Sequence, residues 1–124
     1  MSATPFTVVL LGGESTGKSQ LAQALVTQLG THHALACALV PEHLRSWCER
    51  AQRAPLAHEQ AALAHEQGAW IARAQAQPGV QVVVADTSGV MVAAYSEQYF
   101  QDEGLWPQAL ADHAGAADLT LLMG

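Results

Sequence analysis

The chain has 124 residues, half of them apolar, and a formal net charge of −6 with eleven acidic residues and five basic ones. A chain of this length can bury roughly two-thirds of the surface that its unfolded form exposes, which is enough for one domain. Five basic side chains cannot form the broad cationic surface that nucleic acid or an anionic membrane requires, so we expect neither as a partner. A bound polyanion must therefore be small and held locally.

The N-terminal region predicts a strand, a glycine-rich turn and a helix. Residues 6–11 are apolar and rich in β-branched side chains, and Gly12 and Gly13 follow them. This pattern is typical of a buried strand that enters a turn. From Lys18 the apolar residues recur with the period of a helix, which we expect Gly30 to end.

The rest of the chain alternates the same two patterns. Short apolar runs at residues 35–40, 80–85 and 119–123 predict strands, and helical periodicity covers residues 42–50, 56–77, 89–100 and 105–114. Within the longest helical segment the sequence LAHEQ occurs at residues 56–60 and again at 63–67, which indicates a local duplication on one helix face. Alternating strands and helices predict an α/β fold with a parallel sheet between two helical layers.

Residues 12–19, GGESTGKS, match the phosphate-binding pattern G-x-x-x-x-G-K-[ST] between the first strand and the first helix. Glycines allow backbone N–H groups to point at phosphate oxygens, and the helix N-terminus adds partial positive charge. Lys18, the only lysine in the chain, would contact the β- and γ-phosphates of ATP, and the Ser19 hydroxyl would bind Mg²⁺. The candidate nucleotide-binding residues are Gly13, Glu14, Ser15, Thr16, Gly17, Lys18 and Ser19.

Asp86 follows the apolar run at residues 80–85, which places a carboxylate at the carboxyl end of a strand. Such a carboxylate can hold Mg²⁺ together with Ser19. The alternative is that Asp86, like its neighbours Thr87 and Ser88, caps the next helix. Because Thr87 replaces the second acid with which many motor ATPases activate water, the sequence favours phosphoryl transfer to a bound acceptor.

Glu42 and Arg45 occupy the equivalent place after the second strand. Ligands in open α/β sheets bind at the carboxyl ends of strands, so Glu42 could orient an acceptor hydroxyl or take its proton. Arg45 could steady the acceptor or the migrating phosphoryl group. The alternative is an ion pair on the surface of a short helix. The catalytic candidates are therefore Lys18, Glu42, Arg45 and Asp86.

Other residues that could carry chemistry lack the partners it requires. His58-Glu59 and His65-Glu66 resemble the start of a zinc motif, but alanines stand where the second histidine should be, so we expect a solvated helix face. Cys37 and Cys48 form no disulfide framework, and the N-terminus has no signal-peptide or membrane-span pattern. We expect a soluble cytoplasmic protein, with self-association possible through apolar surface.

The segments GGESTGKS, VPEHLR, VVVADTS, AAYSEQY and DLTLLM follow one another in an order that resembles the ribosylnicotinamide kinase domain family of P-loop ATPase/kinases. The resemblance implies Lys18 and Ser19 for ATP and Mg²⁺, Glu42 and Arg45 on the acceptor side, and Asp86 with Thr87 for metal or acceptor. Tyr95 and Tyr99 fall where the family carries aromatic residues, with core packing as the alternative. His43, Leu44 and Ser88 depart from the family pattern on the acceptor side.

The sequence thus predicts a three-layer, nucleotide kinase-like P-loop fold over residues 1–124, truncated after the fourth strand, with the C-terminal lid and adenine-binding region absent. The expected function is transfer of the ATP γ-phosphoryl group to a small-molecule hydroxyl, with a nucleoside such as nicotinamide riboside as acceptor. One alternative is a nucleotide-binding ATPase or regulatory switch that phosphorylates no acceptor. Another is a remnant that binds neither ligand.

Overall fold

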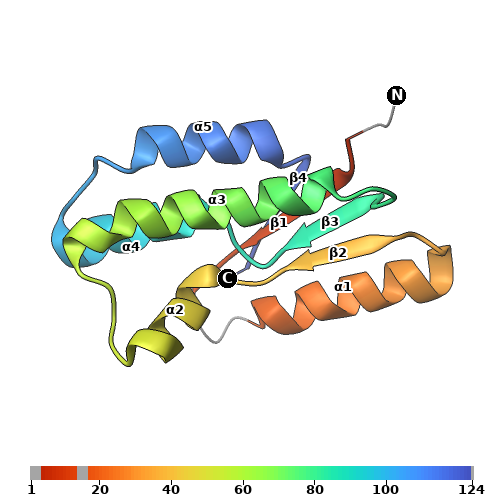
Figure 1. The fold of residues 1–124 in the computed structure, drawn as a ribbon, viewed down its shortest axis with the longest axis horizontal. Coiled ribbons are helices and arrows are strands. Elements are labelled where there is room, and N and C mark those ends of the chain that lie inside the picture. Colours follow the sequence, from red (N-terminus) through yellow and green to blue (C-terminus); the bar gives the residue numbers. More distant parts are fainter. Residues whose placement is uncertain (1–3, 14–16, 124) are drawn as a thin grey trace.

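The computed structural model describes residues 4–13 and 17–123 (Figure 1). Its elements in chain order are β1 (Phe6–Leu11), α1 (Lys18–His33), β2 (Cys37–Val40), α2 (His43–Ala51), a short 3₁₀ helix (Ala57–Glu59), α3 (Gln60–Ala76), β3 (Val82–Ala85), α4 (Gly89–Phe100), α5 (Trp106–Ala116) and β4 (Leu119–Leu122). Every predicted strand and helix is present. The bounds of β1 and α4 are those that the sequence predicted.

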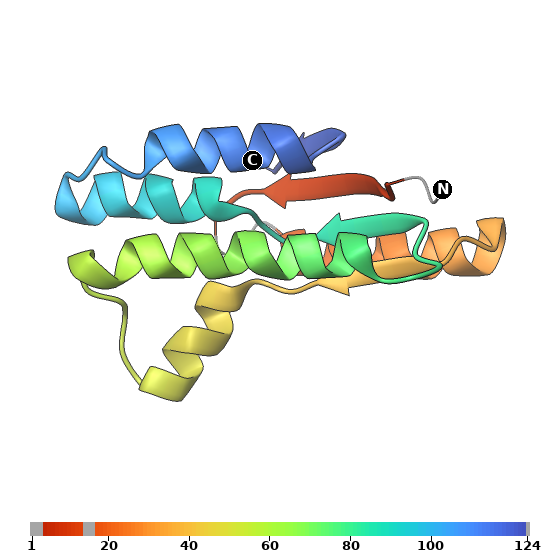
Figure 2. The ribbon, with the colours of Figure 1, turned by 45° about the horizontal axis from the view of Figure 1, so that its top comes forward.

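The strands form one parallel sheet in the order β2-β3-β1-β4. Helix α1 covers one face of this sheet, and α3 and α5 cover the other, as Figures 1 and 2 show from two directions. This arrangement confirms the predicted α/β fold with three layers. Because all strands run the same way, the loops that follow β1, β2 and β3 meet at one edge of the sheet.

Each face of the sheet has its own hydrophobic core, because side chains alternate between faces along a strand. Val8, Leu10 and Val84 pack toward α1, whereas Val9 and Val83 pack toward the opposite helical layer. All four residues of β3 are buried, as expected for a central strand covered on both sides. The continuous apolar run of β3 is explained by this double burial.

Helix α1 does not end at Gly30, so that prediction is wrong. The helix continues to His33, and Ala34 closes it in a left-handed conformation with φ 53°. The Leu35 N–H then donates to the carbonyl of Leu29 at 3.1 Å, which satisfies a free carbonyl of the last turn. Gly30 is exposed in the helix interior, where glycine costs only about 1 kcal/mol relative to alanine, so the chain passes through it.

The helix predicted from residue 56 begins later, at Gln60. Glu59 accepts a hydrogen bond from the N–H of Leu56 at 2.8 Å and pairs with both terminal nitrogens of Arg53, which stabilises a 3₁₀ turn instead. The hydrogen bonds from Arg53 lower the pKa of Glu59 to about 2. Leu56 is consequently half exposed and lies outside the core face of α3.

Helix α4 extends beyond the carboxyl ends of the strands and packs between α3 and α5 (Figure 2). Its first residue must be small, because a Cβ on Gly89 would lie 3.3 Å from the carbonyl oxygen of Ala64 on α3. The glycine thus allows the start of α4 to lie close against α3. In the described ranges, no helix combines the length and apolar character needed to cross a membrane.

Candidate functional site

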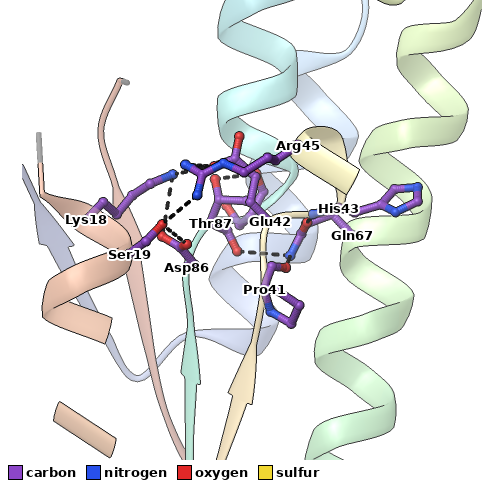
Figure 3. Close-up of polar contacts among 10 residues, drawn as sticks. Lys18, Ser19, Pro41, Glu42, His43, Arg45, Gln67, Asp86 and Thr87 are labelled. Atoms are coloured by element: carbon purple, nitrogen blue, oxygen red, sulfur yellow. Dashed lines mark hydrogen bonds and ion pairs between the residues drawn. The ribbon is translucent and has the colours of Figure 1, made fainter. Parts of the chain in front are cut away.

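The glycine-rich loop leads directly into α1. Gly17 has φ 77°, a left-handed conformation that favours glycine, and Lys18 is the first residue of the helix. Lys18 and Ser19 therefore stand at the helix N-terminus, beside the carboxyl ends of β2 and β3 (Figure 3). Glu14, Ser15 and Thr16 lie outside the described residues, and the predictions for them stay predictions.

Lys18 is buried between two carboxylates (Figure 3). Its Nζ lies 3.1 Å from Glu42 Oε2 and 3.8 Å from Asp86 Oδ1, and the residue is only 6% exposed. A buried ammonium group requires such partners, because desolvating an unpaired charge is very costly. The three residues that the sequence singled out on separate segments are thus brought together.

Ser19 and Asp86 are in direct contact, since the Ser19 hydroxyl donates to Asp86 Oδ2. Asp86 does not cap α4; Ser88 does, with its Oγ accepting from the N–H of Val90 at 3.3 Å. The carboxylate of Asp86 is 8% exposed, and its Oδ1 accepts no hydrogen bond from the described residues. Asp86 therefore points into the site, and the helix-cap alternative is wrong.

Glu42 and Arg45 lie at the start of α2 and reach the same cluster. The side chain of Glu42 is 14% exposed and that of Arg45 is 54% exposed, and Arg45 Nη2 lies 4.0 Å from Glu42 Oε2. Arg45 Nη1 also donates to Ser19 Oγ at 3.2 Å. The pair is thus more than an isolated surface contact, because both side chains extend to groups on α1.

His43, which departs from the family pattern, points away from the site. The ring of His43 lies against Trp70 with centroids 4.6 Å apart, on the side of α3 and away from Lys18 (Figure 3). Burial lowers the pKa of His43, with a smaller opposing effect from Glu66. Tyr99 is 68% exposed, so core packing does not explain it, and its ring lies 6.3 Å from that of Tyr95.

The sequence analysis missed two residues that organise the loops around the site. Gln67 on α3 is 1% exposed and bonds the backbone of Pro41, His43 and Thr87. His113 on α5 connects Ser88 to β4. The repeated LAHEQ segment was the only signal for Gln67, because its second copy ends at this residue.

His113 bridges two hydroxyl groups. Its Nδ1 lies 2.8 Å from Ser88 Oγ and its Nε2 lies 2.7 Å from Thr120 Oγ1. A neutral imidazole donates from one ring nitrogen and accepts at the other, and each hydroxyl can do either, so a neutral ring satisfies both bonds. Burial lowers the pKa of His113, so the folded protein favours this neutral ring.

We expect stability to fall as the pH is lowered through the range in which histidine titrates. The unfolded chain takes up a proton near its ordinary pKa of about 6.5, whereas folded His113 and His43 resist protonation, so their contribution is complete above that value and is lost as pH falls through the lower folded pKa. The unfolding temperature of His113→Asn should depend less on pH than that of the original protein. The same dependence on pH in both proteins would contradict this role of His113.

The donor set suits a divalent cation that binds with a nucleotide. Ser19 supplies a hydroxyl oxygen, and Asp86 supplies a carboxylate whose buried Oδ1 has no hydrogen bond from the described residues. Mg²⁺ prefers oxygen ligands and usually completes its shell with water and substrate phosphates. The described residues contain no group of three or more His, Cys, Asp and Glu side chains that would hold a metal by themselves. The residues therefore fit Mg²⁺ bound together with a phosphate.

A parallel α/β sheet, with a glycine loop leading from β1 into α1 and an acidic residue at the end of β3, defines a P-loop NTPase domain. The chain belongs to the AAA domain family, whose sequence profile matches residues 7–124. Membership implies nucleotide binding, typically with Mg²⁺, and a reaction that is either nucleotide hydrolysis or phosphoryl transfer. It supports the broad class in which the resemblance placed the chain but assigns no nicotinamide riboside kinase activity. The comparison with curated proteins returned no match.

Proposed function

We propose that the protein binds Mg²⁺-ATP and transfers the γ-phosphoryl group to a hydroxyl of a small molecule, a nucleoside such as nicotinamide riboside. The observation that carries this proposal is the convergence of Lys18, Glu42 and Asp86, with Lys18 Nζ 3.1 Å and 3.8 Å from the two carboxylates. A phosphate site needs one cation and one metal ligand, which Lys18 and Asp86 would provide. The second carboxylate near Lys18, that of Glu42, is therefore available for an acceptor.

The proposed roles of Lys18, Ser19 and Asp86 concern the phosphates. Lys18 would exchange its carboxylate partners for phosphate oxygens, and Ser19 with Asp86 would hold Mg²⁺. When bound, Mg²⁺ neutralises charge on the phosphate oxygens. Because phosphoryl transfer depends mainly on positioning and charge neutralisation, these residues would supply contacts that the reaction requires.

The proposed role of Glu42 concerns the acceptor. In the transfer step the acceptor oxygen forms a bond to the γ-phosphorus, the bond from that phosphorus to the bridging oxygen of ADP breaks, and Glu42 takes the acceptor's hydroxyl proton. A positioned carboxylate is a common general base for such proton transfer. Arg45, which is 4.0 Å from Glu42 and 3.2 Å from Ser19, would steady the transferred group.

A second candidate is a nucleotide-hydrolysing or regulatory switch without an acceptor. The identity of residue 87 bears on this choice. Thr87 is 2% exposed and its hydroxyl donates to the carbonyl of Ser88, so it supplies no carboxylate to activate water. This observation favours the kinase, although Glu42 could activate water in a switch.

Calorimetric titration distinguishes the two candidates. With a non-hydrolysable ATP analogue and Mg²⁺ present, we expect affinity for nicotinamide riboside to rise at least about fivefold, a typical coupling between two sites. Purine and pyrimidine nucleosides serve as comparison acceptors. Nucleotide binding without any coupling to a nucleoside would favour the switch. If the protein bound neither ligand, the proposed function would be wrong in both forms.

A further inference from the structure

The side-chain amide of Gln67 holds the two segments that carry Glu42 and Asp86 (Figure 3). Its Oε1 accepts from the N–H of His43 at 2.7 Å, and its Nε2 donates to the carbonyl of Pro41 at 3.2 Å. These two contacts lie on either side of Glu42 in the chain. Nε2 also donates to the carbonyl of Thr87 at 3.4 Å, directly after Asp86.

The orientation of this amide is set by its partners. Two carbonyl oxygens require N–H donors and one backbone N–H requires an acceptor, so reversing the amide would bring acceptors against acceptors. Gln67 is 1% exposed, so water cannot replace these bonds at low cost. One side chain from α3 therefore determines how the loop after β2 lies relative to the loop after β3.

We propose that Gln67 is a positioning residue that sets Glu42 and Asp86 at their places around Lys18 and Ser19. This inference rests on the proposed function, because it assigns the positioning to Mg²⁺-nucleotide binding. The backbone bond from Asp86 N to Val40 O, 2.9 Å long, ends the pairing of β2 with β3. Beyond that bond, the side chain of Gln67 contacts the backbone of both loops.

The LAHEQ repeat supplies a matched control. Gln60 ends the first copy as Gln67 ends the second, and it is also buried, at 4% exposed. Its Nε2 donates to the carbonyl of Pro55 at 3.5 Å, and its Oε1 accepts no hydrogen bond from the described residues. Substitution at Gln60 therefore perturbs the same helix without touching the loops after β2 and β3.

The test is the effect of Mg²⁺ on binding of a non-hydrolysable ATP analogue, measured with Mg²⁺ and with chelator. In the unchanged protein Mg²⁺ should tighten binding strongly. In Gln67→Met, the factor by which Mg²⁺ raises the affinity for the analogue (the Mg²⁺ effect) should be about tenfold smaller, because removing a group that orients a metal ligand usually weakens metal binding by that much. The affinity measured in chelator should change little. Gln60→Met should keep the full effect. A merely structural role for Gln67 would lower stability and leave the Mg²⁺ effect intact, which would overturn the proposal.

Two further measurements keep the proposal testable if Gln67→Met does not fold. Gln67→Glu keeps the acceptor for His43 N but turns an oxygen toward the two carbonyls, so it should also lose the Mg²⁺ effect. In the unchanged protein, amide exchange of His43 should be slow, because its N–H donates to the buried Oε1 of Gln67 at 2.7 Å; exchange of His43 at the rate of an exposed loop would overturn the proposal. Failure of the unchanged protein to bind nucleotide would instead count against the proposed function.

Discussion

Lys18→Met is expected to lower ATP affinity by about 100-fold, as the loss of charge-assisted bonds to phosphate predicts. Methionine fills a similar volume but has no charge. The same change leaves Glu42 and Asp86, whose side chains are 14% and 8% exposed, without their shared cation. Removing one partner of a buried ion pair costs about 3 kcal/mol, so urea unfolding should show lower stability as well.

The two effects of Lys18→Met can be separated with a second substitution. Adding Glu42→Gln removes one negative charge along with the positive one, so stability should recover in part while ATP affinity stays low. Arg73→Met is the surface control, because Arg73 is 65% exposed and its pair with Glu66 at 3.2 Å is a solvent-screened surface contact that contributes little to stability. An ATP affinity that survives in Lys18→Met would remove the basis of the nucleotide-site assignment.

The fold could be predicted because burial leaves a periodic signal in the sequence. Continuous apolar runs marked β1 and β3, and Gly89–Phe100 was predicted with the bounds that the structure has. The wrong predictions concern the ends of helices, which depend on the backbone conformation of single residues or on side-chain pairs outside the helix. Helix α1 passes Gly30 and closes at Ala34, and the pairing of Glu59 with Arg53 delays the start of α3. Neither effect has a period that a sequence pattern could reveal.

The candidate site could be predicted as far as topology determines it. Carboxyl ends of parallel strands meet at one edge, so Glu42 and Asp86 were expected near Lys18. The contacts of Gln67 were not predictable, because they join it to His43, 24 residues away, and to Thr87, 20 residues away, through backbone atoms that carry no sequence signature. The sequence also did not indicate that Lys18, which we expected to contact the phosphates of ATP, pairs with Glu42.

In Glu42→Gln we expect ATP affinity to rise several-fold while phosphoryl transfer falls by about 10²–10⁴-fold, the usual contribution of a general base. The opposite signs follow from the 3.1 Å bond between Lys18 Nζ and Glu42 Oε2. Phosphate must displace Glu42 from Lys18, so a neutral glutamine removes a competing anion. The same glutamine cannot accept the acceptor's proton. Binding is measured by calorimetry and transfer by the ADP formed with acceptor present.

The combination of signs distinguishes this role from simpler ones. If Glu42 only neutralised Lys18, affinity would rise and turnover would not fall; if it only oriented the acceptor, ATP affinity would not change. Glu66→Gln is the matched control, because Glu66 also bonds a cation, Arg73, at 3.2 Å but lies on α3 beside Trp70. It should alter neither quantity. A lower ATP affinity in Glu42→Gln would mean that Glu42 supports the bound nucleotide instead of competing with it, and the base role would then have to pass to another group.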